Sequence, residues 1–111
     1  MSSLADLGVL PVDLDALIAE SAKPLLVEFW APWCGTCRLM APSMIKLRVE
    51  QGDVVEIVTL NVEEGPDAAL THNVLSLPTV IAFRGGAEVR RLNGMVSYAN
   101  LLAETRALAA Q

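Results

Sequence analysis

The segment Leu25–Trp30 places the strongest constraint on how this chain folds. Its residues are apolar except for Glu28, so both faces of a strand formed here would be mainly hydrophobic. A strand that alternates apolar and polar residues can leave one face in water, whereas a strand that is apolar on both faces has to be covered on both. The segment therefore predicts a central strand between two layers of helices.

The rest of the chain alternates strand-like and helix-like patterns. This order predicts an α/β fold with a central mixed β-sheet flanked by helices on both faces. A chain of 111 residues, 53% of them hydrophobic, is long enough for a single domain over residues 1–111 with one core. The expected strands are 25–30, 54–62, 80–83 and 88–92. Helices are expected after Asp13, from 36 to about 52, over 67–72 and after Ser97.

Several element ends have recognisable local signals. Asp13 and Ser97 are suitable N-caps, and Asn73 tolerates the left-handed geometry that ends a helix. Gly85-Gly86 fits the turn of a β-hairpin. Before Asp13, residues 7–11 offer few strand-forming side chains and end in a proline, so we expect a first strand there to be short or absent.

The only two cysteines, Cys34 and Cys37, follow the predicted central strand. A disulfide between them closes so short a loop that it removes almost no entropy from the unfolded chain, which argues against a structural role. The helical pattern from Thr36 places Cys34 at a helix N-terminus, where free N–H groups and the helix dipole stabilise a thiolate and lower the pKa of the cysteine. We therefore predict that Cys34 attacks a disulfide and that Cys37 resolves the mixed disulfide.

The main alternative for the cysteines is half of a zinc site. Tetrahedral zinc needs four ligands, and the chain adds only His72 as a further nitrogen donor. A metal site would need a second chain. We therefore expect no metal, and we assign His72 no function.

The sequence around the cysteines resembles the active-site segment of thioredoxins. The segment runs from Val27 to Arg38 and contains Trp-Ala-Pro-Trp-Cys-Gly-Thr-Cys, with Ala-Pro soon after. Leu77-Pro78-Thr79, the residues 83–86 and Asn93-Gly94 fall where thioredoxins have a proline loop, a hairpin turn and a late glycine. The resemblance covers roughly residues 13–109 and implies the thioredoxin fold.

The resemblance also implies an activity. It indicates a protein-disulfide reductase that cycles between a Cys34–Cys37 dithiol and disulfide, with disulfide-containing proteins as clients and no bound cofactor. Electrons would come from a thioredoxin reductase, with NADPH as the ultimate source. Two alternatives stay open: an oxidoreductase specialised as an isomerase or oxidant, and an interaction module of the same fold that holds a partner without redox turnover.

Glu28 has a role in this resemblance, because thioredoxins place a buried acid at the matching position. There the acid exchanges a proton with the inner cysteine, and burial raises its pKa toward neutrality. The alternative is a carboxylate that reaches solvent beside Lys46 or Arg38. A lysine that often lies near the acid is replaced here by Thr59, and this loss of positive charge should raise the pKa of the acid further.

Other residues fit a surface for client proteins. At Pro78 the resemblance implies a cis peptide bond that faces the cysteines, with the backbone of Leu77 available to an extended client segment. Trp30 is expected in the core, whereas Trp33 is expected on an exposed apolar surface. The residues expected to dock clients on that surface are Trp33, Gly35, Val74, Leu77, Gly94 and Met95.

Thr36 departs from the family pattern, because thioredoxins usually carry proline at this position. Threonine adds a hydroxyl that can donate a hydrogen bond to the thiolate. A stabilised thiolate favours the dithiol, which makes the disulfide a better oxidant. We therefore predict that Thr36 makes this protein less reducing than typical thioredoxins.

Composition excludes several other functions. Eight basic and 13 acidic residues give a net charge of −5 and offer no basic surface for nucleic acid. No apolar run reaches the roughly 18 residues of a membrane helix, and the start of the chain lacks the basic and apolar regions of a signal peptide. We expect a monomer in the cytoplasm, where a cysteine pair is more often catalytic or metal-binding than structural.

Overall fold

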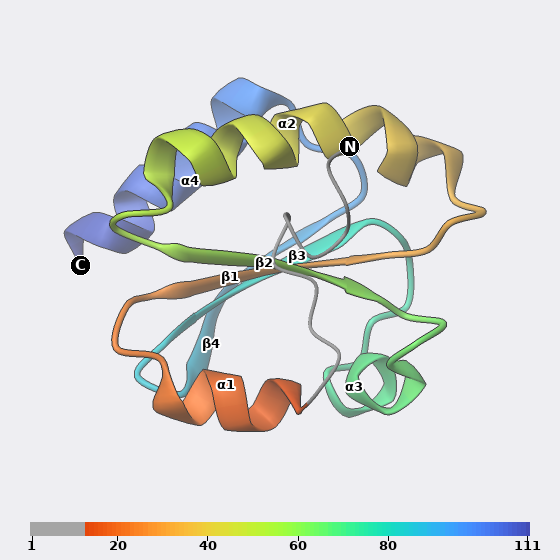
Figure 1. The fold of residues 1–111 in the computed structure, drawn as a ribbon, viewed down its shortest axis with the longest axis horizontal. Helices are drawn as coiled ribbons and strands as arrows, with labels where there is room; N and C mark the ends of the chain where they lie inside the picture. The colour runs from red at the N-terminus through yellow and green to blue at the C-terminus, as the bar shows by residue number, and fades with distance from the viewer. Residues whose placement is uncertain (1–12) are drawn as a thin grey trace.

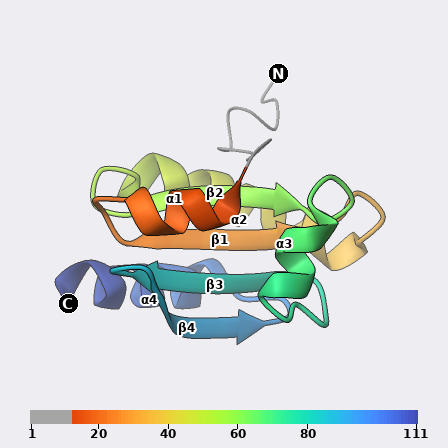
Figure 2. The same ribbon diagram turned by 90° about the horizontal axis from the view of Figure 1, so that it is seen from below.

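The computed structural model describes residues 13–111, which contain a four-stranded mixed sheet in the order β2-β1-β3-β4. β1 (Leu25–Trp30) pairs in parallel with β2 (Glu56–Asn61) and antiparallel with β3 (Thr79–Arg84), and β3 pairs antiparallel with β4 (Ala87–Asn93). Helices α2 (Gly35–Gln51) and α4 (Tyr98–Ala110) cover one face, and α1 (Leu14–Glu20) and α3 (Pro66–Thr71) cover the other (Figures 1 and 2). The expected sheet with helices on both faces is confirmed.

β1 is buried on both faces, as its sequence predicts. Leu26 belongs to a buried cluster with Met40 of α2, and Val27 belongs to a second cluster with Ile18 of α1. Because successive side chains of a strand point to opposite faces, Glu28 lies on the same face as Leu26, under α2. The end of β1 leads directly into the start of α2, so this end of the sheet holds the cysteines (Figure 1).

Local signals set the ends of several elements as expected. Asp13 Oδ1 accepts a hydrogen bond from the amide of Asp15 over 3.0 Å, and Ser97 Oγ accepts one from an amide in the first turn of α4 over 3.2 Å. Gly85 and Gly86 have φ values of 60° and 84°, which a tight two-residue hairpin turn requires. The predicted caps and hairpin are therefore confirmed.

Several expected elements have different bounds, and β3 and β4 are each one residue longer at both ends than expected. The strand expected over 54–62 is limited to β2, because the turn that ends α2 continues through Val55, whose amide donates to the carbonyl of Gln51 over 3.1 Å. The short helix begins one residue early at Pro66, whose fixed φ suits the first turn, and Asn73 beyond its end has a φ of 55°. The strand considered at 7–11 lies outside the described residues.

Candidate active site

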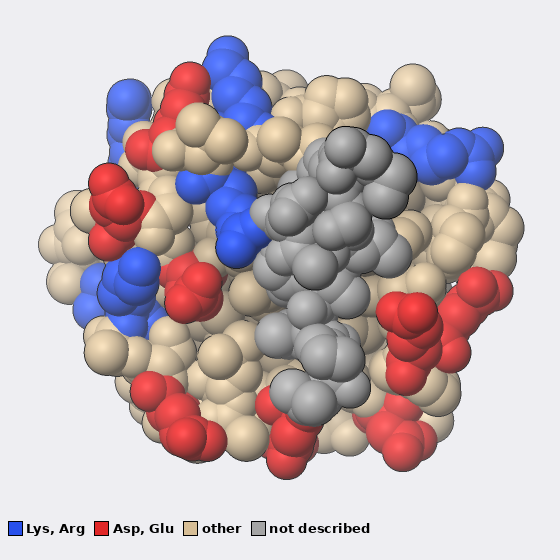
Figure 3. Space-filling view, viewed as in Figure 1, with Lys and Arg blue, Asp and Glu red and all other residues tan. Residues whose placement is uncertain are grey.

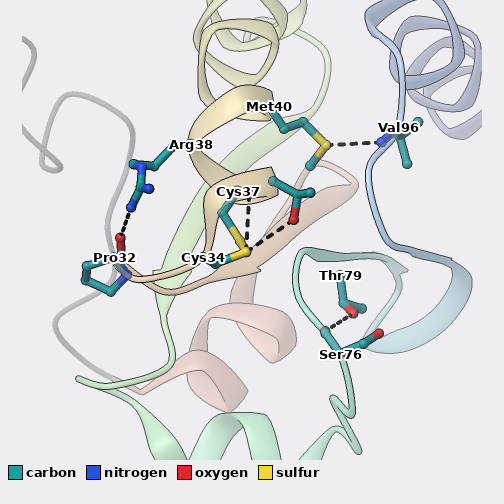
Figure 4. Close-up of a disulfide and its surroundings, with 9 residues drawn as sticks. Pro32, Cys34, Cys37, Arg38, Met40, Ser76, Thr79 and Val96 are labelled. Carbon is teal, nitrogen blue, oxygen red and sulfur yellow. Dashed lines mark hydrogen bonds between the residues drawn. A yellow bond between two sulfur atoms is a disulfide. The ribbon is translucent and has the colours of Figure 1, made fainter.

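Cys34 occupies the N-cap of α2, where β1 turns into the helix. Its amide donates to the carbonyl of Ala31 over 3.1 Å, which fixes the turn, and its backbone is extended with φ −88° and ψ 108°. Cys37 lies one turn into the helix and is joined to Cys34 by a disulfide, with 5.2 Å between the two Cα atoms (Figure 4). The predicted placement of the pair at a helix N-terminus is confirmed.

The sulfur of Cys34 has two polar neighbours from its own helix. The amide of Cys37 donates to Cys34 Sγ over 3.2 Å, and the Oγ1 atom of Thr36 lies 3.4 Å from the same sulfur (Figure 4). In the reduced protein, both groups can donate to a negative sulfur and so favour the thiolate. The guanidinium of Arg38 is held on the other side of the loop, where Nη1 donates to the carbonyl of Pro32 over 2.6 Å.

The Glu28 side chain is buried and does not reach solvent. The residue is 3% exposed, and burial raises the pKa of its carboxyl to about 8. Its register partner on β2 is Thr59. Thr59 is the residue expected to replace the lysine that often lies near the acid in thioredoxins. Among the described residues, Glu28 Oε2, Thr59 Oγ1 and Trp30 Nε1 are buried without hydrogen-bond partners.

A small cavity joins Glu28 to the inner cysteine. It has a volume of about 80 Å³, and both Glu28 and Cys37 contribute to its wall. Trp30 and Thr59 also line it, so the three residues with unpartnered polar groups and the inner cysteine all surround one space. A cavity of this size with several polar groups has room for water.

The loop before β3 packs against the disulfide. Leu77 contacts the buried cluster formed by Ala31, Cys34 and Cys37, and the Leu77–Pro78 peptide bond is cis, as expected. The hydroxyl of Thr79 donates to the carbonyl of Ser76 over 2.6 Å and closes this loop (Figure 4). Ser76 and Leu77 of this loop therefore lie next to Cys34.

An apolar groove of about 440 Å³ opens next to Cys34. Trp33 forms one part of its wall, is 65% exposed, and donates a hydrogen bond from Nε1 to Glu63 Oε2 over 2.9 Å. Val74 and Leu77, both expected on the docking surface, line the groove. The residues within 13–111 that line it are Trp33, Cys34, Val62, Ala69, Val74, Leu75, Ser76 and Leu77.

The structure divides the predicted docking residues. Apart from its chain neighbours and its own helix backbone, no described residue lies within 4 Å of the position that the Cβ of Gly35 would take, and Gly35 is not part of the groove wall. Gly94 has a φ of 84° and donates its amide to the carbonyl of Pro78 over 2.8 Å, which brings Gly94 and the exposed Met95 to the other side of the proline loop. The groove and the Gly94–Met95 segment thus flank the proline loop from two sides.

Sequence reasoning missed part of the groove. Leu75 is 92% exposed. Its position in the loop three residues before Pro78, outside the predicted strands and helices, is a sequence signal that could have placed it on the client-binding surface. Val62, Ala69 and Glu63 carry no local signal, since they reach the site only through the packing of β2 and α3.

Two further findings bear on the kind of site. Residues 13–111 hold no group of three or more His, Cys, Asp or Glu side chains placed to bind a metal ion. None of the helices in that range combines the length and the apolar character needed to cross a membrane.

A disulfide-bonded Cys-x-x-Cys pair at a helix N-terminus, on a sheet covered by helices, defines a thiol–disulfide oxidoreductase. The family model described as Thioredoxin matches residues 9–107. The chain therefore belongs to the thioredoxin family, and its fold is the thioredoxin fold.

Individual relatives agree with this assignment. The thioredoxin of Streptomyces clavuligerus is 42% identical over 88 residues, which cover 79% of this chain and 81% of that protein. The chloroplastic M-type thioredoxin of Chlamydomonas reinhardtii is 38% identical over 86 residues, 78% of this chain, and the match spans 61% of that protein. The bifunctional thioredoxin reductase/thioredoxin of Mycobacterium leprae is 40% identical over 85 residues, 77% of this chain and 19% of that protein.

Solved structures show the same fold. The oxidised form of mitochondrial thioredoxin 3 from Saccharomyces cerevisiae superimposes with a TM-score of 0.83. The two chains are 26% identical, and the match covers 95% of this chain and 98% of the yeast chain.

Proposed function

We propose that this protein reduces protein disulfides with Cys34 as the attacking and Cys37 as the resolving cysteine. The Cys34 thiolate attacks one client sulfur, and the other client sulfur leaves as a thiolate and takes up a proton. Cys37 loses its proton, attacks Cys34 in the mixed disulfide, and releases the second client sulfur, which is protonated in turn. The client gains two electrons and two protons, while Cys34 and Cys37 lose two electrons and form their disulfide.

One observation carries this proposal. Cys34 Sγ lies at the N-cap of α2 and accepts the Cys37 amide over 3.2 Å, while Cys37 is close enough for the disulfide and only 3% exposed. A sulfur at the helix N-terminus, beside an open groove, suits the attacking cysteine. Both cysteines are buried, Cys34 at 7% and Cys37 at 3% exposure, but only Cys34 lines the open groove, so Cys37 suits the role of the cysteine that acts after a client has bound.

We propose that Glu28 accepts the proton that Cys37 loses. Its support is the shared cavity between the carboxyl and Cys37, together with a carboxyl pKa of about 8. At pH 7 such a group is ionised in about one molecule in ten, so it can both accept and return a proton near neutral pH. Glu28 therefore serves the second step, in which Cys37 becomes a thiolate.

The remaining predicted residues serve clients and the redox potential. We propose that an extended client segment lies along the proline loop, with Leu77 offering backbone groups and Pro78, which lacks an N–H, leaving the path open. Trp33 and Gly35 border this path near Cys34, and Gly94 and Met95 border it beyond the proline. Thr36 is the residue that tunes the potential, through the contact of its hydroxyl with Cys34 Sγ.

We also propose how the protein is supplied with electrons and where it acts. In the Mycobacterium leprae relative, a thioredoxin reductase and a thioredoxin share one polypeptide, which supports a thioredoxin reductase as the electron donor here. NADPH is the proposed ultimate source. We propose that the protein is a monomer, acts in the cytoplasm and binds no cofactor. Light scattering of the purified chain tests the monomer, and cell fractionation tests the location. An absorbance spectrum of the purified protein tests the absence of a bound coloured cofactor.

A disulfide-reduction assay with the reduced wild type and two serine variants tests the proposed roles. Cys34→Ser should lose turnover, whereas Cys37→Ser should form a mixed disulfide with the client and stop there. An interaction module would give a different result, since Cys34→Ser would still bind its partner and the wild type would show no cysteine-dependent turnover. A protein specialised as an isomerase would rearrange a scrambled disulfide protein faster than it reduces it.

A further inference from the structure

The apolar groove beside Cys34 has acidic side chains along one rim. Val62, after β2, and Ala69, in α3, both line the groove. The connection between these two residues carries three carboxylates, on Glu63, Glu64 and Asp67, and all three residues are exposed. Figure 3 shows acidic atoms gathered on the side of the molecule where β2 leads into α3.

Hydrogen bonds hold this acidic rim in place. The carboxylate of Glu63 accepts the indole N–H of Trp33 from across the groove over 2.9 Å. The amide of Glu63 donates to Asn61 Oδ1 over 2.9 Å, and the amide of Glu64 donates to the carbonyl of Asn61 over 3.0 Å. The turn that carries Glu63 and Glu64 is therefore built onto the end of β2, and the Glu63 carboxylate has a defined position beside Trp33.

Nothing among residues 13–111 neutralises the rim, since none of its three carboxylates forms an ion pair there. Arg38, a basic residue in the first turn of α2, donates a hydrogen bond to the carbonyl of Pro32 in the active-site turn. The basic atoms near the start of α2 lie apart from the acidic atoms near α3 (Figure 3). A client that enters the groove thus meets an apolar floor with negative charge on the α3 side.

We infer that this surface selects clients in which the attacked cysteine lies next to an apolar side chain and is flanked by lysine or arginine. The inference rests on the proposed reductase function and specifies the clients of that same site. The apolar side chain fills the groove between Trp33 and Leu77, and the cationic side chains face Glu63, Glu64 and Asp67. Complementary charges at the rim of an interface act mainly on the association rate, and salt weakens them.

Three synthetic peptides test this selection. Each has one cysteine between two leucines, joined in a disulfide to 5-thio-2-nitrobenzoate, and the residues outside the leucines are both lysine, both glutamine or both glutamate. The protein is reduced with dithiothreitol, freed of it, and mixed with each peptide in a single turnover. Release of the yellow thiolate then gives the second-order rate constant, and the leaving group is the same in all three reactions.

We expect the lysine peptide to react about fivefold faster than the glutamate peptide at low ionic strength, with the glutamine peptide between them. This ratio should fall toward one in 0.5 M salt. The variant Glu64→Gln/Asp67→Asn should lose most of the ratio, and Glu64→Lys should shift the preference toward the glutamate peptide. Glu63 stays unchanged in these variants, because its carboxylate also holds Trp33.

A matched control separates the rim from the net charge of the protein. Glu20→Gln/Asp53→Asn removes two exposed carboxylates at the opposite end of the sheet, where Lys23 Nζ donates to the carbonyl of Gly52 over 3.0 Å. This variant should keep the wild-type ratio. Thermal unfolding of every variant shows whether each one is folded. The single variant Glu64→Gln tests the rim if the double variant is misfolded.

The possible results distinguish this inference from the proposed function. Equal rates for the three peptides, or a charge preference that falls equally in the control variant, would overturn the inference while the reductase function stands. Failure of the reduced protein to react with any of the peptides, the neutral one included, would overturn both. A second-order rate constant that falls as the protein concentration rises would indicate that a second copy of the chain occupies the groove. That result would also contradict the inference.

Discussion

Glu28 and Thr59 are register partners on the two parallel strands β1 and β2, and both are buried. Among residues 13–111, Glu28 Oε2 and Thr59 Oγ1 have no hydrogen-bond partner, and no cationic group pairs with the acid. A carboxyl in such surroundings is more stable with its proton than without it. This arrangement links the redox site to the stability of the whole protein.

Replacing Glu28 by glutamine should stabilise the protein at neutral and alkaline pH. The folded protein keeps the proton up to a pKa of about 8, whereas the unfolded chain loses it near 4.5. The free energy of unfolding of the wild type therefore falls as the pH rises between these values. Glu28→Gln removes this dependence, so it should gain about 3 kcal/mol at pH 7 and little below pH 4.5. Denaturant unfolding at pH 4.5, 7 and 8.5 measures the difference.

Glu28→Gln should also resolve the mixed disulfide more slowly than the wild type, although it is more stable at neutral pH. A glutamine cannot accept the proton of Cys37, so the step that resolves the mixed disulfide should slow by a factor of about 100. Glu20→Gln, an exposed change of the same kind, should alter neither quantity. A Glu28→Gln protein with an unchanged resolution rate would contradict the proposed proton transfer, and one with unchanged pH-dependent stability would contradict the raised pKa of the buried carboxyl.

Thr59→Val should raise the free energy of unfolding by about 1 kcal/mol. The two side chains have nearly the same shape, and the hydroxyl that is lost has no partner among the described residues. Removal of a buried polar group without a partner removes its desolvation cost. Denaturant unfolding of the wild type and the variant at pH 5, where Glu28 is protonated, isolates the effect of Thr59. A loss of stability would show that the hydroxyl is bonded in solution.

Thr36→Val should make the protein more reducing. The hydroxyl of Thr36 lies 3.4 Å from Cys34 Sγ, and valine keeps the branched shape without the donor. Loss of one hydrogen bond to the thiolate, about 1.4 kcal/mol, corresponds to a redox potential that is more negative by about 30 mV. Equilibration with dithiothreitol at known ratios measures the potential, and Thr36→Ser, which keeps a hydroxyl, is the control. The prediction is wrong if Thr36→Val and Thr36→Pro leave the potential unchanged or raise it.

Features that depend on short stretches of sequence could be predicted closely. β1 follows from an apolar run, and the caps at Asp13 and Ser97 follow from side chains that accept amides two or three residues away. The position of Cys34 at the start of α2 follows from the helical pattern after Thr36. Each of these features is decided by residues that are neighbours in the chain.

Features that depend on packing could not be predicted in the same way. The sequence left two environments open for Glu28, and its burial is settled by α2 covering that face of β1. The contact between Trp33 and Glu63 joins residues 30 positions apart, and no local pattern indicates it. The sequence pattern sets the end of β2 one residue too late and its start two residues too early, because valines occur in the turn as well as in the strand.

Leu75→Ala should weaken client reduction without affecting stability. Leu75 lines the groove but is 92% exposed, so its truncation should change the free energy of unfolding by less than about 0.5 kcal/mol. If clients fill the groove, the loss of apolar contact should raise KM for a client with leucine beside the cysteine about three- to tenfold, with little change in kcat. Leu70→Ala is the matched control, because Leu70 is 76% exposed on α3 and lies outside the groove wall. Equal KM values for the two variants would show that clients do not enter the groove.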